Sequence, residues 1–164
     1  VLISCVGIFG DGTVLSESDT FSTIRRSIEI NALGVMEFAL KLIVRANGTG
    51  SRLRIVLVSS TAAEVGSMDV GYGVAKAALN GFVASISKRF ATSGVTSFSV
   101  SPGVFESTMS AGVDPQRLQS AIDATHLKRP GTLSEIASVV IFAALDAPDF
   151  MTGEILRVNG GQHR

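Results

Sequence analysis

Hydrophobic residues along this chain fall into two patterns, short runs rich in apolar residues and longer stretches with helical spacing. The short runs predict four buried strands, at residues 1–7, 54–59, 95–100 and 154–158. The helical spacing predicts three helices, over about residues 21–46, 71–91 and 134–145. The segment 104–128 is expected to be looser. Strands that alternate with helices form parallel β-α-β units, and wholly apolar strands indicate a sheet covered on both faces, so the pattern predicts an α/β fold.

Composition narrows the expected partners. The chain has 164 residues with 14 basic and 14 acidic side chains, which gives no electrostatic reason to expect nucleic acid or an anionic membrane as a partner. No apolar run reaches the ~18 residues of a membrane span. The single cysteine, Cys5, cannot form an internal disulfide, which fits a reducing cytoplasmic location. His126 and His163 are isolated in sequence, and no spacing suggests a metal site.

Candidate chemistry gathers after the predicted strands, because ligands of parallel α/β sheets bind beyond the carboxyl ends of the strands. Tyr72 and Lys76 are four residues apart and share one face of a helix. A nearby ammonium is expected to lower the pKa of the phenol from about 10, which would make it a usable acid or base. Ser60 follows a strand twelve residues before Tyr72 and can converge with it, with Ser59 as the competitor. Asn31 lies in mid-helix, where asparagine is mildly unfavourable.

Together, Asn31, Ser60, Tyr72 and Lys76 resemble the catalytic tetrad of the short-chain dehydrogenase/reductase family. Three longer segments are also similar to the family. Residues 1–7 look like its fourth strand, and Pro102-Gly103-Val104-Phe105-Glu106-Ser107-Thr108-Met109 is similar to its P-G-x-x-x-T-x-M segment. Residues 129–161 resemble the C-terminal end of the 3-oxoacyl-acyl-carrier-protein-reductase-like branch. The resemblance covers the whole chain in the family's order.

The resemblance implies a Rossmann-like, doubly wound parallel sheet, represented by its C-terminal two-thirds in a single partial domain over residues 1–164. It also implies an NAD(P)-dependent oxidoreductase that interconverts a secondary alcohol and a ketone. Tyr72 would be the acid/base, and Lys76 would lower its pKa and hydrogen-bond the nicotinamide ribose. Ser60 would hold the reacting oxygen, and Asn31 would anchor a water in a proton relay. NAD or NADP, with no preference determined, would contact six residues: Gly7, Tyr72, Lys76, Pro102, Gly103 and Ser107.

Two departures from the family pattern leave an alternative open. The family's Asn-Asn-Ala-Gly motif is replaced by Ser4-Cys5-Val6-Gly7, and the Asn usual before the Pro-Gly turn is replaced by Phe98. The family's Gly-rich turn and the residue that selects NAD or NADP are expected upstream of Val1. The alternative is therefore a non-catalytic remnant or oligomerisation module that binds no dinucleotide.

The expected partners are a small carbonyl or alcohol substrate and further copies of the chain, as a homotetramer or dimer. Residues 109–128 would form a substrate lid with several apolar side chains. The identity of the substrate and the direction of the reaction do not follow from the sequence.

Overall fold

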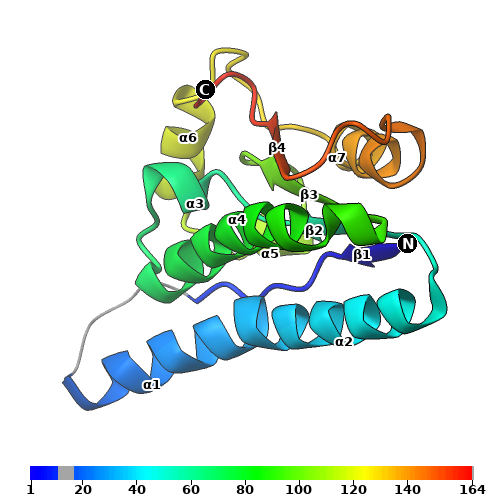
Figure 1. Cartoon of the computed structure of the whole chain (residues 1–164). Helices are drawn as coiled ribbons and strands as arrows, with labels where there is room; N and C mark the ends of the chain where they lie inside the picture. Colours follow the sequence, from blue (N-terminus) through cyan, green and yellow to red (C-terminus); the bar gives the residue numbers. More distant parts are fainter. Residues whose placement is uncertain (11–16, 164) are drawn as a thin grey trace.

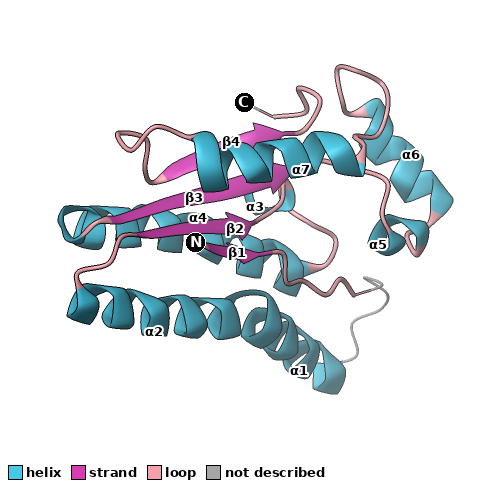
Figure 2. Cartoon of the chain, turned by 90° about the vertical axis from the view of Figure 1, so that its right-hand side faces the viewer, coloured by secondary structure: helices cyan, strands magenta, loops and turns pink. Residues whose placement is uncertain are grey.

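A parallel sheet with helices on both faces forms the centre of the molecule (Figures 1 and 2). The structure is a computed structural model that describes residues 1–10 and 17–163, with side chains except those of residues 17–20. Within these residues, four strands pair in the order β1-β2-β3-β4, and every pair is parallel. They are β1 (Leu2–Ser4), β2 (Leu53–Val58), β3 (Val95–Pro102) and β4 (Glu154–Val158). This confirms the predicted parallel α/β architecture.

Seven α-helices connect and cover the strands of the described chain. They are α1 (Glu17–Ile28), α2 (Gly34–Thr49), α3 (Ala62–Val65), α4 (Val70–Phe90), α5 (Thr108–Ala111), α6 (Pro115–Asp123) and α7 (Leu133–Ile141). A π-helical turn, Glu29–Leu33, joins α1 to α2, so the two form one long helical run. A second π turn, Phe142–Asp146, extends α7.

Two apolar clusters fill the two faces of the sheet. On one face, buried residues of α2 and α4, including Ile43 and Leu79, pack against Ile55 and Leu57 of β2. On the other face, Phe98 of β3 packs with the alanines that follow α7. Burial on both faces explains the apolar run of β2, whereas in β3 the buried Ser97, Ser99 and Ser101 alternate with apolar residues such as Phe98 and Val100.

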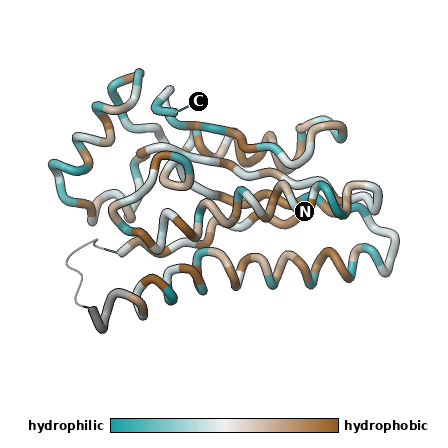
Figure 3. The backbone as a smooth tube through the Cα atoms, turned by 60° about the vertical axis from the view of Figure 1, so that its left-hand side comes forward, coloured by the Kyte–Doolittle hydropathy of each residue, from teal (hydrophilic) through white to brown (hydrophobic). Residues whose placement is uncertain are grey.

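Helix α2 is also hydrophobic on its outer side. Figure 3 shows hydrophobic positions recurring along this helix at the lower edge of the molecule. Phe38, Leu40 and Val44 lie on α2 and expose 56%, 42% and 71% of their surface, respectively. Among the residues that the structure describes, no helix is both long and apolar enough to cross a lipid bilayer.

Several predicted boundaries are wrong. The first helix has already begun at Glu17, and segment 104–128 contains α5 and α6. The α6 start has a recognisable signal, because Asp114 caps the helix and Pro115 follows as its first residue. Helix α7 begins at Leu133, because the hydroxyl of Thr132 accepts a hydrogen bond from the backbone N–H of Glu135 in a capping box.

Candidate active site

Ser60 and Tyr72 meet at the carboxyl end of β2. Ser60 lies two residues beyond the strand, and Tyr72 lies in the first turn of α4. The Ser60 hydroxyl accepts a hydrogen bond from the backbone N–H of Ala62 at 3.1 Å, and it lies close enough to the Tyr72 phenol to lower the pKa of that group. The competitor, Ser59, is turned elsewhere, since its hydroxyl donates to the Lys76 carbonyl oxygen at 2.9 Å. The structure therefore brings Ser60 to the tyrosine, whereas the hydroxyl of Ser59 forms a structural hydrogen bond to the backbone of α4.

Lys76 lies one turn after Tyr72 and is almost completely buried, with 3% of its surface exposed. Its ammonium donates to the carbonyl oxygens of Val6, at 3.0 Å, and Val58, at 2.9 Å. Burial lowers the pKa of Lys76 from 10.5 to about 8, and the nearby Cys5 thiol opposes this shift. An ammonium has three hydrogens, so one remains without a hydrogen-bond partner among the described residues.

The pKa of Tyr72 is raised, which contradicts the lowered value predicted from the Tyr72–Lys76 spacing. Burial of the phenol is the largest cause, the Ser60 hydroxyl lowers the pKa, and the negative charge of Asp69 raises it. The ammonium of Lys76 lies 5.6 Å from the ring centroid and is directed to two backbone carbonyls. Desolvation of the phenolate therefore outweighs the opposing effect of the Ser60 hydroxyl.

Asn31 is fully buried in the π turn between α1 and α2. Its Oδ1 accepts from the backbone N–H of Ile8 at 2.7 Å, and its Nδ2 donates to the Ile8 carbonyl at 3.0 Å and to the Ser27 hydroxyl at 2.9 Å. These bonds explain the asparagine in mid-helix. Its side chain forms with the backbone of Ile8 the pair of hydrogen bonds that a neighbouring strand would otherwise form. The water relay assigned to Asn31 stays a prediction.

Gly7 belongs to the segment that follows β1, which runs directly past Lys76 and Asn31. A Cβ at position 7 would lie 3.3 Å from the Lys76 ammonium and 3.4 Å from Asn31 Oδ1. The next aromatic residue, Phe9, packs edge-on against Tyr72, with ring centroids 5.1 Å apart and planes at 83°. Sequence reasoning missed this contact because residues 8–10 form no regular element.

The three remaining cofactor candidates lie at the end of β3 and in the segment that follows it. The carbonyl of Pro102 accepts from both the N–H and the hydroxyl of Thr61, which ties the β3 end to the Ser60 loop. A Cβ at Gly103 would lie 2.9 Å from the Cα of Asn159, so tight packing alone requires glycine there. The Ser107 hydroxyl takes part in a capping box with Ser110 at the start of α5.

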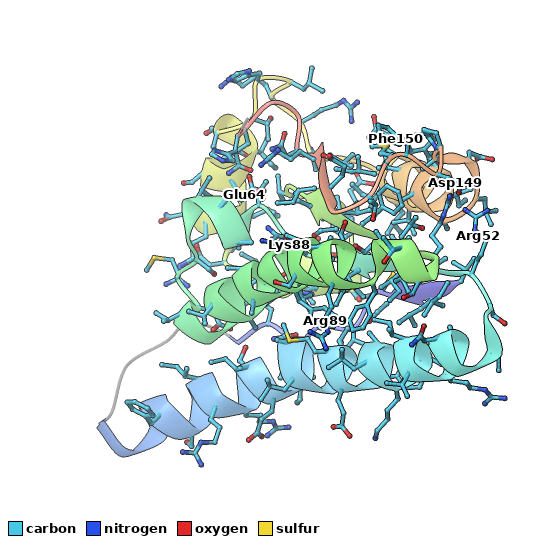
Figure 4. All side chains as sticks on the ribbon, viewed as in Figure 1. Arg52, Glu64, Lys88, Arg89, Asp149 and Phe150 are labelled. Atoms are coloured by element: carbon cyan, nitrogen blue, oxygen red, sulfur yellow. The ribbon has the colours of Figure 1, made fainter. Side chains whose placement is uncertain are left out.

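A charged cluster that the sequence did not reveal lies beside α3. Glu64 Oε2 contacts Arg157 Nε at 2.7 Å and His163 Nε2 at 3.0 Å, although Glu64 precedes Arg157 by 93 residues in the chain. Figure 4 shows Glu64 on α3, away from the Arg52–Asp149 ion pair. No group of His, Cys, Asp and Glu that could hold a metal ion occurs within the described ranges.

Comparison with known proteins gives the family. Residues 1–163 match the family model described as Enoyl-(Acyl carrier protein) reductase. The chain is 31% identical to Nodulation protein G of Rhizobium meliloti (strain 1021), over 98% of this chain and 65% of that protein. It is also 31% identical to the 3-oxoacyl-[acyl-carrier-protein] reductase FabG of Salmonella typhimurium, over 99% of this chain and 66% of the reductase. The chain belongs to the short-chain dehydrogenase/reductase family, which confirms the resemblance inferred from its motifs.

Solved structures agree on the fold. The structure superimposes on sorbitol-6-phosphate 2-dehydrogenase SrlD from Erwinia amylovora with a TM-score of 0.83 at 22% sequence identity. The match covers 99% of this chain and 68% of that one. The sheet is therefore of the Rossmann-like, doubly wound type, and the chain spans about two-thirds of the length of the curated relatives above.

Proposed function

We propose that this chain carries the catalytic residues of an NAD(P)-dependent oxidoreductase that interconverts a secondary alcohol and a ketone. One observation supports the proposal above all. Ser60 and Tyr72 come from different segments, yet their hydroxyls lie close together at the carboxyl ends of the strands, with the buried ammonium of Lys76 one helical turn away. Two converging hydroxyls can bind a single oxygen atom of a substrate.

Each residue then has a defined task. Ser60 holds the reacting oxygen, and Tyr72 donates its phenolic proton to a carbonyl oxygen or removes the proton from an alcohol. The raised pKa keeps the phenol protonated at neutral pH, which suits the role of acid in carbonyl reduction. Lys76 keeps a cationic group close to the phenolate that proton transfer leaves behind. Asn31 holds the segment after β1 in place through Ile8.

The residues fit the nicotinamide-ribose end of a dinucleotide. The Lys76 ammonium gives two hydrogens to backbone carbonyls, and its remaining hydrogen is available for a ribose hydroxyl. When bound, the cofactor supplies or accepts the hydride. Glycine at position 7 keeps a side chain away from the Lys76 ammonium, because a Cβ there would lie 3.3 Å from it.

Three variants test the proposal by the change in NADH or NADPH absorbance with a series of ketones. Tyr72→Phe removes the acid and should lower turnover by about 100-fold or more while cofactor binding persists. Ser60→Ala should also lose most activity, whereas Ser59→Ala is the matched control and should retain it. If Tyr72→Phe turns over at the normal rate, the assignment of the acid/base is wrong.

The second candidate is an oligomerisation module without catalytic activity. It is favoured by the exposed apolar side chains of Phe38, Leu40 and Val44 on α2 and by the internal role of the Ser107 hydroxyl. A fluorescence titration of the 164-residue chain with NADH and NADPH separates the two candidates. Saturable binding supports the oxidoreductase. The module is supported by a failure to bind either dinucleotide, together with a dimer or tetramer in analytical ultracentrifugation.

A further inference from the structure

The carboxylate of Asp69 connects two segments that are 59 residues apart. Asp69 is the residue immediately before α4 and exposes 9% of its surface. Its Oδ1 accepts a hydrogen bond from the backbone N–H of Tyr72 at 2.9 Å. Its Oδ2 accepts from the backbone N–H of Gly10 at 2.7 Å. One side chain therefore holds both the start of the helix that carries Tyr72 and the end of the segment that follows β1.

The two bonds have different physical origins. The bond to Tyr72 is a helix N-cap, which Asp, Asn, Ser and Thr all form. A cap needs only one oxygen, so the second carboxylate oxygen is available to another donor. Glycine allows the close approach of that donor, because a Cβ at position 10 would lie 3.0 Å from Asp69 Oδ2. Hydrogen bonds to an ionised acceptor are stronger than those to a neutral one.

Through Gly10, the carboxylate also fixes the aromatic contact at the site. Phe9 precedes Gly10 and places its ring edge-on against Tyr72. On the other side of Phe9, both backbone groups of Ile8 are bonded to Asn31. Phe9 is thus held between two hydrogen-bonded neighbours, one anchored by Asn31 and one by Asp69.

Asp69 also contributes the negative charge closest in sequence to the phenol. Its charge raises the pKa of Tyr72, in the same direction as burial and against the effect of the Ser60 hydroxyl. Among the described side chains, Lys76 on the same helix also lies near the ring, and the Cys5 thiol acts on that lysine. At Gly71, in the first turn of α4, the nearest atoms of α1 belong to Ile24 and Ser27, and neither of these side chains titrates.

We propose that Asp69 is a positioning residue for Tyr72, whose carboxylate bridges Gly10 and the start of α4 and so fixes Phe9 against the phenol. The catalytic meaning of this bridge rests on the function proposed above, whereas the bridge itself does not. The variant Asp69→Ser separates the two bonds, because serine still caps the helix but is uncharged and too short to reach Gly10.

The chain offers a direct optical probe, since Tyr72 is its only tyrosine and it has no tryptophan. In Asp69→Ser, the Gly10 amide should exchange with solvent about tenfold faster or more, while the Tyr72 amide stays protected. Titration of the tyrosinate absorbance should give a lower pKa than in the wild type. The near-ultraviolet circular dichroism of the tyrosine should weaken as Phe9 loses its fixed position.

A matched control is Asp114→Ser, which changes another aspartate N-cap. Asp114 is exposed and accepts from the amides of Gln116 and Arg117 at the start of α6. This variant should leave all three readouts as in the wild type.

The proposal fails if Asp69→Ser leaves the Gly10 exchange rate and the tyrosine pKa unchanged, or if Asp114→Ser alters them equally. If Asp69→Ser does not fold, hydrogen exchange of the wild type provides the test. A Gly10 amide that exchanges as fast as that of an unstructured loop would refute the bridge. None of these measurements uses cofactor or substrate. Normal turnover by Tyr72→Phe would overturn the proposed function, but it would not change the expected results of these three measurements on Asp69→Ser.

Discussion

The buried ammonium of Lys76 should make the stability of this protein rise with pH above neutrality. Its pKa is about 8 in the folded chain, against an ordinary 10.5. Between these values the unfolded chain binds more protons than the folded chain, so raising the pH favours folding. The full difference between the two pKa values corresponds to about 3 kcal/mol of unfolding free energy. At neutral pH the folded protein is less stable by this amount, because the lysine is both charged and buried. From about pH 7 to about pH 9.5, the free energy of unfolding should increase by about 2 kcal/mol from this residue alone.

Urea denaturation followed by far-ultraviolet circular dichroism measures this increase. Other groups also titrate in the same range, so the informative quantity is the difference in unfolding free energy between the wild type and Lys76→Met at each pH. Lys76→Met removes the charge and should lose the increase assigned to the lysine. At neutral pH its stability reflects two opposing effects, relief of the desolvation penalty and loss of hydrogen bonds to Val6 and Val58.

Lys88→Met is the matched control, because Lys88 lies on the same helix and is exposed (Figure 4). It should show the same pH dependence as the wild type. A difference between wild type and Lys76→Met that stays constant from about pH 7 to about pH 9.5 would refute the reasoning, because the lysine would then have the same pKa in both states.

Two further substitutions test local packing and capping by the same denaturation assay. Gly103→Ala should destabilise the protein by about 1–3 kcal/mol, because its Cβ would lie 2.9 Å from the Asn159 Cα. Gly48→Ala in α2, where no atom lies within 4 Å of the added Cβ, should instead be neutral or stabilise by up to about 1 kcal/mol. Thr132→Ala removes the capping box of α7 and should lower the free energy of unfolding by about 1 kcal/mol. The control Ser134→Ala should have little effect. Equal losses of stability in the two variants would show that Thr132 is not the cap.

The local sequence was sufficient for the elements and for part of the site. Apolar runs predicted the strands, and β4 begins and ends at the predicted residues. The four-residue spacing of Tyr72 and Lys76 placed both on one helix, and a continuous helix there follows directly from periodicity. The two short helices of segment 104–128 were missed, although the Asp114-Pro115 pair is a local start signal.

The electrostatic state of the site did not follow from local sequence. Spacing alone suggested a lowered pKa for Tyr72, but the direction depends on how much water the fold removes from the phenol and on where the lysine points. Both are set by β1, β2 and the segment after β1, which contribute the Val6 and Val58 carbonyls from distant parts of the chain.

Sequence alone therefore determined the family, the α/β class and the identity of the candidate catalytic residues, because these depend on periodicity and on residues at fixed spacing. Tertiary structure decided which serine faces the tyrosine, what Asn31 holds, and that Asp69 bridges Gly10 to the helix start. The physical reason is that hydrogen bonds and desolvation act over a few ångströms in space, between groups that the chain separates by 59 residues for Asp69 and Gly10 and by 70 for Lys76 and Val6.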